Sequence, residues 1–524
     1  MRIDFLEIKS QWKNLNGFRI DFDESRYIAV IIGKNGAAKS NVLEALITIF
    51  RDLDLKEPCT FAYEIKYLIE GKNVALRGGV GKQPTAKIDG SAASLDDIRE
   101  RWSPRYVVGY YSGVSDRFEE LFAKHDLKAR NLTLVPPSET STPQRLELRR
   151  FIYARPVHGL FALLAFYFSK DEKIAKFLRE LPRIEGFDSA LLVVHKPEWA
   201  KSDATPEDFW GAKGPVRDLL EHFQANSLAP FSRKVKVKRD FAKSETRELI
   251  YLYLPDLNAL ESLASEYNYD PNSLFQALDT MRLSGLIEDI RVRVKVAGAT
   301  GAIHTRQLSE GEQQLLTVLG LMRFTRNAGS LYLLDEPDTH LNPSWEIEYL
   351  ERLRTVGGID RNSHTILSTH DPMLVAGLCR EEIRVLMRLD DGHIIAAEPE
   401  QDPRGTGVAN VLTSPLYGLE SQLDPFSLRV LNRIYEVSLT GRSGQRTRHL
   451  RRLRKLVPAL EMAEMSPDPY RNIAREAYRL AQERLVEPAE SVVSPALPRN
   501  SVLSDRRKTL IDRLAAKLVN EVDQ

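Results

Sequence analysis

Residues 28–50 constrain this chain more than any other segment. The run IAVII at 28–32 is followed by a glycine-containing turn and then by SNVLEALITIF. A continuous apolar run predicts a strand buried on both faces, as in the middle of a parallel sheet. In the later segment the apolar residues recur at helical spacing, which predicts an amphipathic helix. The chain is therefore expected to contain a buried strand, a tight loop and a helix in direct succession.

The loop has the composition of a phosphate-binding loop. It comprises Gly33, Lys34, Asn35, Gly36, Ala37, Ala38, Lys39 and Ser40, and we include Asn41 in the predicted nucleotide-binding set. Backbone N–H groups and the helix N-terminus would surround the phosphates of ATP, Lys39 would neutralise the β- and γ-phosphates, and the Ser40 hydroxyl would ligate Mg²⁺. Ala38 occupies the position where a glycine usually precedes the lysine. The sequence leaves open whether its methyl group crowds the phosphates or is tolerated.

Further apolar runs predict more buried strands at 106–111, 331–334 and 365–368, separated by helical stretches. This alternation predicts an α/β fold with a largely parallel sheet. The run at 331–334 ends in Asp335 and Glu336, so both carboxylates are expected at the carboxyl edge of the sheet, where ligands bind. We expect Asp335 to hold the Mg²⁺ shell and Glu336 to act as the general base on the attacking water.

Two other motifs accompany the acidic pair. The segment LSEGEQQ begins a predicted helix, and Ser309 with Glu312 forms a capping box there, so Ser309 and Gly311 have a structural explanation as well as a functional one. The sequence DTHLNP directly follows Glu336-Pro337, and STHD ends the next strand. His370, in the latter, lies where a γ-phosphate sensor is expected.

In this order the motifs resemble the Walker A, signature, Walker B, D-loop and H-loop of ABC-type ATPase heads, over about 1–130 and 300–390. The resemblance implies heads that act in pairs, with Ser309 and Gly311 of one subunit contacting the γ-phosphate held by the other. The Q-loop glutamine of the family is missing after the strand at 106–111, and Ser112, Ser115 or Asp116 is the available substitute. Lys13 and Asn14 resemble the basic residue and asparagine beside the nucleotide in SMC-like heads, although an exposed turn explains them equally well.

A narrower resemblance involves VVGYYSGVSDRFEELF, FWGAKGPV, LLDEPDTHLNPSW and LTSPLYGLESQLDPFS. These segments are similar to prokaryotic ATPases of Septu-type and retron-associated antiphage systems. The resemblance implies an HNH-type nuclease as partner and, in retrons, a reverse transcriptase with its RNA–DNA product. We find neither an acidic Toprim-like cluster after 371 nor an HNH-type histidine cluster, so this chain itself is not expected to cut nucleic acid.

Length and composition set the remaining limits. The 524 residues suggest about three domains. We expect an ATPase lobe at 1–130, an inserted α+β region at 131–300, a second ATPase lobe at 301–405 and a helical C-terminal region at 406–524. A net charge of +1 excludes a strongly basic coat for nucleic acid, and the two cysteines are too few for a disulfide framework. No apolar run reaches the roughly 20 residues of a membrane span, so we expect a cytoplasmic protein without membrane contact.

Local basic segments leave DNA open as a ligand. Four cations within RSGQRTRHLRRLRK share one helical face: Arg448, Arg451, Arg452 and Lys455. Phosphate contact and a solvated face are equally good explanations. Three cations alternate along each of two predicted strands, at 234–238 and 291–295, and a solvated strand face is the simpler explanation for each.

Three functions fit these motifs. The first is an ATPase that regulates a partner nuclease in phage defence, acting as a homodimer or higher assembly. The alternative is a RecF- or SMC-like repair ATPase that clamps DNA without a nuclease partner. A transporter motor is disfavoured, because Glu312 replaces the glutamine that transporter signatures favour and because a large mixed insertion is foreign to such motors.

Overall fold

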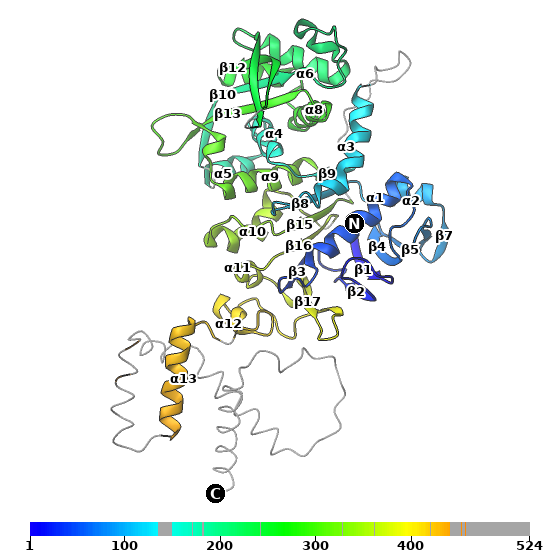
Figure 1. Ribbon diagram of the computed structural model, residues 1–524, viewed down its shortest axis with the longest axis vertical. Helices are drawn as coiled ribbons and strands as arrows, with labels where there is room; N and C mark the ends of the chain where they lie inside the picture. Colours follow the sequence, from blue (N-terminus) through cyan, green and yellow to red (C-terminus); the bar gives the residue numbers. More distant parts are fainter. Residues whose placement is uncertain are drawn as a thin grey trace. The chain divides into compact units, whose positions relative to one another are not determined.

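The computed structural model describes residues 1–134, 149–169, 171–180, 183–240, 243–326, 329–360, 362–419, 421–440, 452 and 456. The chain divides into two compact units, Met1–Pro399 and Glu400–Gln524. The first unit contains three sheets and carries all the motifs up to His370 (Figure 1). The four-part division expected from the sequence stays a prediction.

The central sheet of the first unit has seven strands, in the order β18-β17-β3-β16-β15-β8-β9. Its members are β3 (Ile28–Gly33), β8 (Val107–Tyr111), β9 (Phe151–Tyr153), β15 (Leu331–Asp335), β16 (His364–Ser368), β17 (Ile383–Arg388) and β18 (Ile394–Ala397). Every neighbouring pair is parallel except β17 with β18. The predicted α/β fold with a largely parallel sheet is confirmed, and β3, β15 and β16 lie at its centre.

Helices follow the strands as the apolar spacing predicted. Helix α1 (Lys39–Leu55) begins directly after the loop that ends β3, and α9 (Glu310–Phe324) precedes β15. Helix α10 (Pro343–Thr355) and the short α11 (Pro372–Val375) follow β15 and β16. Helices α10 and α11 begin with Asn342 and Asp371, whose side chains accept hydrogen bonds from backbone N–H groups of the first turn. The strand ends between these helices form the edge where the motifs meet.

A second, antiparallel sheet covers α1 in the order β2-β1-β4-β5-β6-β7. Its strands are β1 (Arg2–Ile8), β2 (Phe18–Asp21), β4 (Tyr63–Ile69), β5 (Lys72–Gly78), β6 (Thr85–Ile88) and β7 (Ser91–Ala93), and α2 (Leu95–Arg101) follows them. Phe50 of α1 packs edge-on against Tyr67 of β4, with ring centroids 5.6 Å apart. The two sheets therefore enclose α1 and fix the direction in which its N-terminus points.

The inserted region contains a third sheet, in the order β11-β12-β10-β13-β14. Its strands are β10 (Ile184–His195), β11 (Phe231–Asp240), β12 (Lys243–Leu254), β13 (Ile287–Val296) and β14 (Ile303–His304). Its helices are α4 (Pro156–Phe166), α5 (Glu172–Glu180), α6 (Gly214–Ala225), α7 (Leu257–Ser265) and α8 (Pro271–Ser284). Helix α4 begins at Pro156, after Phe151–Tyr153, which forms the edge strand β9 of the central sheet.

The inserted region is joined tightly to the central core. Gly159 of α4 and Gly320 of α9 allow these helices to touch: a Cβ at Gly159 would lie 2.7 Å from Thr317 Oγ1, and one at Gly320 would lie 2.4 Å from Ala162 Cβ. Phe166 of α4 also stacks on Phe324 of α9. A larger side chain at either glycine would push α4 away from α9.

The described part of the second unit contains α12 (Val408–Thr413) and α13 (Pro425–Thr440). In the described part of the chain, none of the helices combines the length and the apolar character needed to cross a bilayer.

Candidate functional site

The loop between β3 and α1 brings backbone groups to the surface and its lysine inward. Lys34, Asn35 and Gly36 lie toward solvent, whereas Ala37 is buried. Gly36 has a φ of 83°, in the left-handed region that favours glycine. The loop amides and the N-terminus of the 17-residue helix α1 create a positive end that suits an anion.

Ala38 occupies the capping position of α1 in a left-handed conformation, with φ 71° and ψ 20°. This conformation costs an alanine roughly 1–2 kcal/mol, whereas glycine adopts it freely. The methyl group is buried at 8% exposure and packs in the hydrophobic core. The loop therefore keeps the backbone path that a glycine would allow, and the alanine is accommodated at the expense of local strain.

Lys39 and Ser40 begin α1 beside the end of β15. The Lys39 side chain is buried and its Nζ donates a hydrogen bond of 2.9 Å to the Gly33 carbonyl, so the ammonium lies across the loop. A Cβ at Gly33 would lie 2.6 Å from the Leu386 carbonyl oxygen of β17, so this close approach requires a glycine. The Ser40 hydroxyl lies close enough to Asp335 to lower the pKa of its carboxyl.

Asp335 is 1% exposed at the carboxyl end of β15. Its Oδ1 accepts a hydrogen bond from Ser368 Oγ of the neighbouring β16. Its Oδ2 is buried and forms no hydrogen bond within the described residues. Burial raises the pKa of this carboxyl, although Ser368 and Ser40 act in the opposite direction. A buried carboxylate oxygen with unused lone pairs, next to a serine hydroxyl, is suited to a small divalent cation such as Mg²⁺.

Glu336 and His370 face each other across the next turn. Glu336 has a left-handed φ of 51°, and its amide donates to the Ser368 carbonyl at 3.0 Å. Its Oε1 lies 3.3 Å from His370 Nδ1. Strained backbone of this kind is concentrated at functional sites. The strain here points the carboxylate toward the histidine, at the edge where α1 begins.

The segment after Glu336 is tied to the strand that carries His370. Asp338 is buried and accepts a hydrogen bond from Thr369 Oγ1. Burial raises the pKa of Asp338 to about 6. Burial, with the charges of Asp371 and Asp338, raises the pKa of Glu346 to about 7. Burial and neighbouring carboxylates therefore favour the protonated forms of Asp338 and Glu346 relative to free carboxyl groups.

Ser309 caps α9 as the sequence predicted, and the structure confirms the capping box. Its Oγ accepts from the Glu312 amide at 3.3 Å, and its own amide donates to Glu312 Oε2 at 2.7 Å. Ser309 is exposed, whereas Gly311 is buried against the segment after Glu336: a Cβ there would lie 2.5 Å from the His340 carbonyl oxygen. The start of α9 and the D-loop are therefore a single packed unit. In the described residues no hydrogen bond or ion pair joins Ser309 to the β3–α1 loop.

Lys13 and Asn14 lie beside the β3–α1 loop. Asn14 Nδ2 is 3.5 Å from the Gly36 carbonyl, and its Oδ1 accepts a hydrogen bond from Asn41 Nδ2. Lys13 forms an ion pair with Glu44, a buried residue of α1. Asn41 is therefore held at the loop by a neighbouring side chain.

Sequence reasoning missed Arg117. It lies between β8 and α3 (Glu119–Leu134), where the sequence analysis looked for a glutamine. Its Nη2 donates to Asn41 Oδ1 at 2.7 Å, it forms an ion pair with Glu44, and its charge lowers the pKa of Asp335. An arginine directly after the expected glutamine position was the available signal.

Of the three expected glutamine substitutes, Ser112 lies nearest to the acidic pair. Its amide donates to the Asp335 carbonyl at 3.2 Å, and its Oγ is 3.2 Å from Thr339 Oγ1. Ser115 is exposed and lies 3.4 Å from the Tyr111 hydroxyl, and Asp116 is also exposed. Ser112 and Arg117 are therefore the residues of this loop that lie next to the candidate site.

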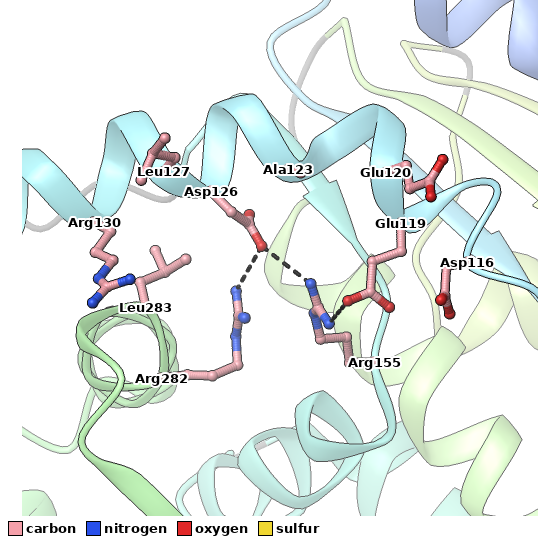
Figure 2. A pocket seen from close by; sticks show the side chains of 10 residues that line it. All are labelled: Asp116, Glu119, Glu120, Ala123, Asp126, Leu127, Arg130, Arg155, Arg282 and Leu283. Atoms are coloured by element: carbon pink, nitrogen blue, oxygen red, sulfur yellow. Dashed lines mark hydrogen bonds and ion pairs between the residues drawn. The ribbon is translucent and has the colours of Figure 1, made fainter. Parts of the chain in front are cut away.

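Helix α3 follows the loop that contains Arg117 and contacts residues of the inserted region. Asp126 lies between Arg155 and Arg282, and Glu119 binds Arg155 (Figure 2). These side chains line a cavity of about 470 Å³ between α3 and α8. Because its walls carry carboxylates as well as arginines, the cavity shows no preference for one sign of ligand charge. The ion pairs link the loop of Arg117 to the inserted helices.

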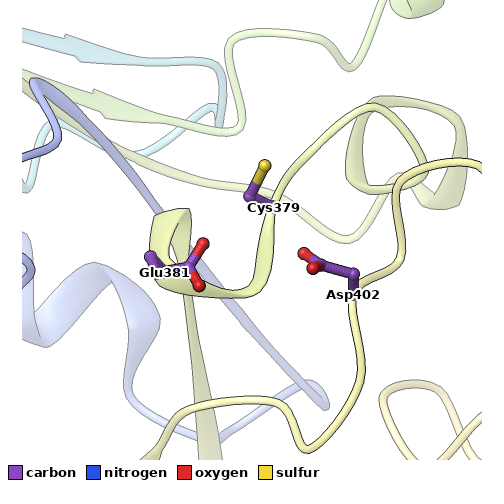
Figure 3. A group of neighbouring side chains, drawn as sticks. All are labelled: Cys379, Glu381 and Asp402. Carbon is purple, nitrogen blue, oxygen red and sulfur yellow. The ribbon is translucent and has the colours of Figure 1, made fainter.

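The sequence also predicted four cations on one helical face of the C-terminal region. Arg448, Arg451 and Lys455 lie outside the described residues, and Arg452 is an exposed helical residue. Both cysteines are free thiols, as their number predicted. Cys379 caps the turn Arg380–Glu382, which carries Glu381 (Figure 3).

Comparisons with known proteins give related sequences. A family model for an AAA domain, whose description names the AbiEii toxin of a Type IV TA system, matches residues 194–376. The Septu protein PtuA of Bacillus mycoides (strain KBAB4) is 28% identical over 177 residues, which are 32% of this chain and 24% of that protein. The Retron Vc95 probable ATPase of Vibrio cholerae serotype O1 biovar El Tor is 23% identical over 232 residues, which are 39% of this chain and 43% of that protein. The chain thus spans less than half the length of these two relatives.

Two solved structures align with most of this chain at low TM-scores. The Smc head bound to the C-winged helix domain of ScpA has a TM-score of 0.35 at 14% identity, covering 76% of this chain and 98% of that chain. The recombination mediator RecF–ATPrS has a TM-score of 0.27 at 16% identity, covering 76% of this chain and 97% of that chain. In sequence, the chain is similar to ATPases of the Septu and retron type, and its residues 194–376 match an AAA domain.

Proposed function

We propose that this chain is an ATPase that binds ATP on the β3–α1 loop and hydrolyses it at the carboxyl edge of the central sheet. The observation that carries the proposal is the meeting of Ser40, at the start of α1, with Asp335, at the end of β15. Residues almost 300 positions apart in the sequence thereby bring together a phosphate-binding loop and a buried carboxylate. This combination is what nucleotide-triphosphate hydrolysis requires.

The loop would bind the triphosphate through charge and backbone donors. The amides of 34–37 and the N-terminus of α1 attract anions. Lys39 Nζ is buried with the Gly33 carbonyl as partner, at 2.9 Å. A buried ammonium is stabilised further by a phosphate oxygen, so Lys39 would turn from this carbonyl toward the β- and γ-phosphates. Asn14 and Asn41 would hold the outer side of the loop.

Ser40 and Asp335 are the residues that would hold Mg²⁺. The buried Asp335 Oδ2 and the adjacent Ser40 hydroxyl are the oxygen donors this cation prefers. When bound, Mg²⁺ neutralises charge that develops on the phosphate oxygens. Ser368 holds the Asp335 carboxylate in place through Oδ1 and leaves Oδ2 for the metal.

Glu336 and His370 would complete the reaction site. Glu336 is the proposed general base for the attacking water, because its carboxylate is half-buried at the same edge and is not held in an ion pair with lysine or arginine within the described residues. His370 lies 3.3 Å from Glu336 Oε1 and would orient this carboxylate and contact the γ-phosphate. General-base catalysis of this kind contributes about 10²–10⁴-fold to a rate.

A second copy of the chain would complete the site. Ser309 is exposed and, among the described residues, forms no hydrogen bond with the β3–α1 loop of its own chain, while Gly311 fixes the start of α9 against the D-loop. We propose that Ser309 and Gly311 of one copy contact ATP held by the other, in a homodimer or higher assembly. Contact of Ser309 and Gly311 with the other copy's ATP would be transmitted to the first copy's own site through the D-loop. Thr339 of this loop contacts Ser112 beside Asp335.

The biological role proposed is antiphage defence. The similarity to a Septu protein and to a retron ATPase supports this role. By that resemblance, ATP binding and hydrolysis would regulate a partner HNH-type nuclease, and a reverse transcriptase with its RNA–DNA product is a further partner in a retron context. The alternative, a DNA-clamping ATPase without a nuclease partner, predicts that no nuclease activity depends on ATP binding by this chain.

A phage-plaque assay tests this role. Cells carrying the chain with its neighbouring genes should resist phage, and cells carrying Lys39→Ala should lose the protection. Lys72→Ala, on the exposed β4–β5 hairpin, is the matched control and should protect fully. Protection by the Lys39→Ala variant would contradict the proposal. So would wild-type chain that is purified from protected cells without any nuclease subunit.

A further inference from the structure

The inserted sheet has one buried and one open face. The buried face carries the even-numbered residues of β10, β12 and β13, such as Leu192, Leu252 and Ile290. Helices α6, α7 and α8 pack on these strands. Figure 1 shows α6 and α8 beside β10, β12 and β13. The residues that alternate with these point to the opposite face. That face, called the open face here, carries exposed side chains such as Phe231 and Arg291, while Val193 and Leu249 on it are buried.

Aromatic rings form the first half of the open face. Phe231 of β11 is 55% exposed and stacks on Tyr251 of β12, with ring centroids 4.8 Å apart and planes 10° apart. Tyr253, two residues further along β12, is 37% exposed and lies opposite Leu191 of β10. Exposed aromatic rings on a sheet are costly in water unless a partner covers them. Their flat surfaces are suited to stacking with planar groups.

Cations form the second half. Arg291, Arg293 and Lys295 alternate along β13 on the same face, and Leu191 pairs with both Tyr253 and Arg291, which sets them in one row across the sheet. Arg233 of β11 lies on the aromatic side, because it follows Phe231 by two residues. Since neighbouring strands are about 4.8 Å apart, the rings of β12 and the cations of β13 are separated by about two strand spacings.

The acidic residues near this face leave an excess of positive charge. Asp289 is shared by Arg291, at 2.6 Å, and Arg306, at 2.5 Å. Asp188 is 3.9 Å from Arg293, and Arg247 pairs with Glu288 at 2.6 Å. Among the described residues, six cations lie on or beside this face with these three carboxylates. The six are Arg233, Arg247, Arg291, Arg293, Lys295 and Arg306.

We propose that this face binds single-stranded nucleic acid. Unpaired bases would stack on Tyr253, Tyr251 and Phe231, and the phosphates would lie along the cations of β13. Stacking on rings beside a basic track is the common means of binding single strands without sequence preference, because every base has a flat face. A duplex hides its bases and would use the cations alone. The proposal is independent of the ATP site, which lies on a different sheet.

Fluorescence anisotropy of the full-length chain tests the proposal. The probes are a labelled 20-nucleotide DNA strand, the RNA of the same sequence and the matching DNA duplex, each across a salt series. The double variant Phe231→Ala, Tyr253→Ala should bind both single strands about 5- to 100-fold more weakly, while duplex binding changes little. A triple change of Arg291, Arg293 and Lys295 to Gln should lower the salt slope for single strands by about 0.7 per lost contact.

Two controls share the chemistry but not the face. Tyr269→Ala removes an exposed tyrosine of the turn between α7 and α8, and the pair Lys234→Gln, Lys236→Gln removes cations from the other side of β11. Both should bind like the wild type, and all variants should keep ATP affinity, which separates this proposal from that of the ATP site. Wild-type chain that binds neither single strand at low salt would overturn the proposal. The proposal would also be overturned if both face variants bound single strands as tightly as the wild type. This holds even if these variants lost binding to a protein partner.

Discussion

The Glu336 carboxylate and the His370 imidazole meet at the carboxyl edge of the central sheet, with Oε1 3.3 Å from Nδ1. The two residues come from the ends of adjacent strands, β15 and β16, and their separation is fixed by the parallel register that pairs Asp335 with Ser368. The left-handed backbone of Glu336 turns its side chain to this position. The pair therefore joins the two strands at the point where we propose that ATP is hydrolysed.

Replacing Glu336 by Gln should separate ATP binding from hydrolysis. Glutamine keeps the side-chain shape and a hydrogen bond to His370 but cannot take a proton from water. We expect kcat to fall about 10²- to 10⁴-fold with ATP affinity retained, and an ATP-dependent dimer to accumulate in sedimentation experiments. Glu348→Gln on α10, an exposed change, should leave kcat unaltered. Wild-type turnover in Glu336→Gln would remove Glu336 from the role of base.

Arg117→Gln should weaken Mg²⁺-dependent nucleotide binding. The change removes a cation that lowers the pKa of Asp335 and that anchors Asn41. Asp335 would then hold its proton more tightly, and the half-saturating Mg²⁺ concentration at fixed ATP should rise by about 2- to 10-fold, since a screened charge contributes on the order of 1 kcal/mol. Arg77→Gln, on an exposed hairpin, is the control. An identical Mg²⁺ titration would show that Arg117 has only a packing role.

Substitution of Ala38 by glycine and by valine should change the melting temperature in opposite directions. Glycine relieves the left-handed strain of roughly 1–2 kcal/mol but adds about 0.5–1 kcal/mol of unfolded-state entropy. Ala38→Gly is therefore expected to raise the melting temperature slightly and to keep ATP binding. Ala38→Val should lower both, because β-branched residues avoid positive φ. A lower melting temperature for the glycine variant would show that the buried methyl group outweighs the strain.

The carboxyl cluster predicts a pH dependence of stability. Asp338 and Glu346 have folded-state pKa values of about 6 and 7, above their unfolded values. The folded chain therefore binds more protons than the unfolded chain between about pH 4 and 7, and these groups make it less stable as the pH rises through that window. The Asp338→Asn variant keeps an acceptor for Thr369 but cannot ionise.

We expect Asp338→Asn to gain stability over the wild type at pH 8 and to lose this advantage as the pH falls to about 4. The comparison of the two proteins by thermal unfolding cancels opposing groups such as His158, whose pKa burial lowers to about 4. A difference that is constant across pH would show that the pKa of Asp338 is the same in the folded and the unfolded chain.

The sequence predicted the part of this edge that depends on local pattern. Buried strands and the helix after the loop follow from apolar spacing. This spacing was enough to place Lys39 at the start of a helix, and Asp335 and His370 at or just after the ends of strands. Arg117 could not be found in this way, because its role depends on contacts with Glu44 and Asn41 across two other elements. The hairpins from β4 to β7 were also missed.

The aromatic and basic face shows the same limit more clearly. Alternation along 291–295 was visible in the sequence, but the row that joins Arg291 to Tyr253 exists only through the antiparallel register with β10. This register pairs strands that are distant in the sequence, so the alternation within one segment cannot give it. The strand β9 also depends on tertiary contacts, since β8 of the central sheet supplies its hydrogen bonds.

The most direct test of the central claim is the ATP affinity of Lys39→Ala, measured by isothermal titration calorimetry with Mg²⁺ present. Alanine is a good helix former at the start of α1, so the fold should survive, and Lys72→Ala provides the matched control. Because the variant loses a charged contact to the phosphates, we predict affinity at least about 10- to 100-fold weaker than in the wild type and the control. ATP affinity equal to that of the wild type would contradict the assignment of this loop as the nucleotide site.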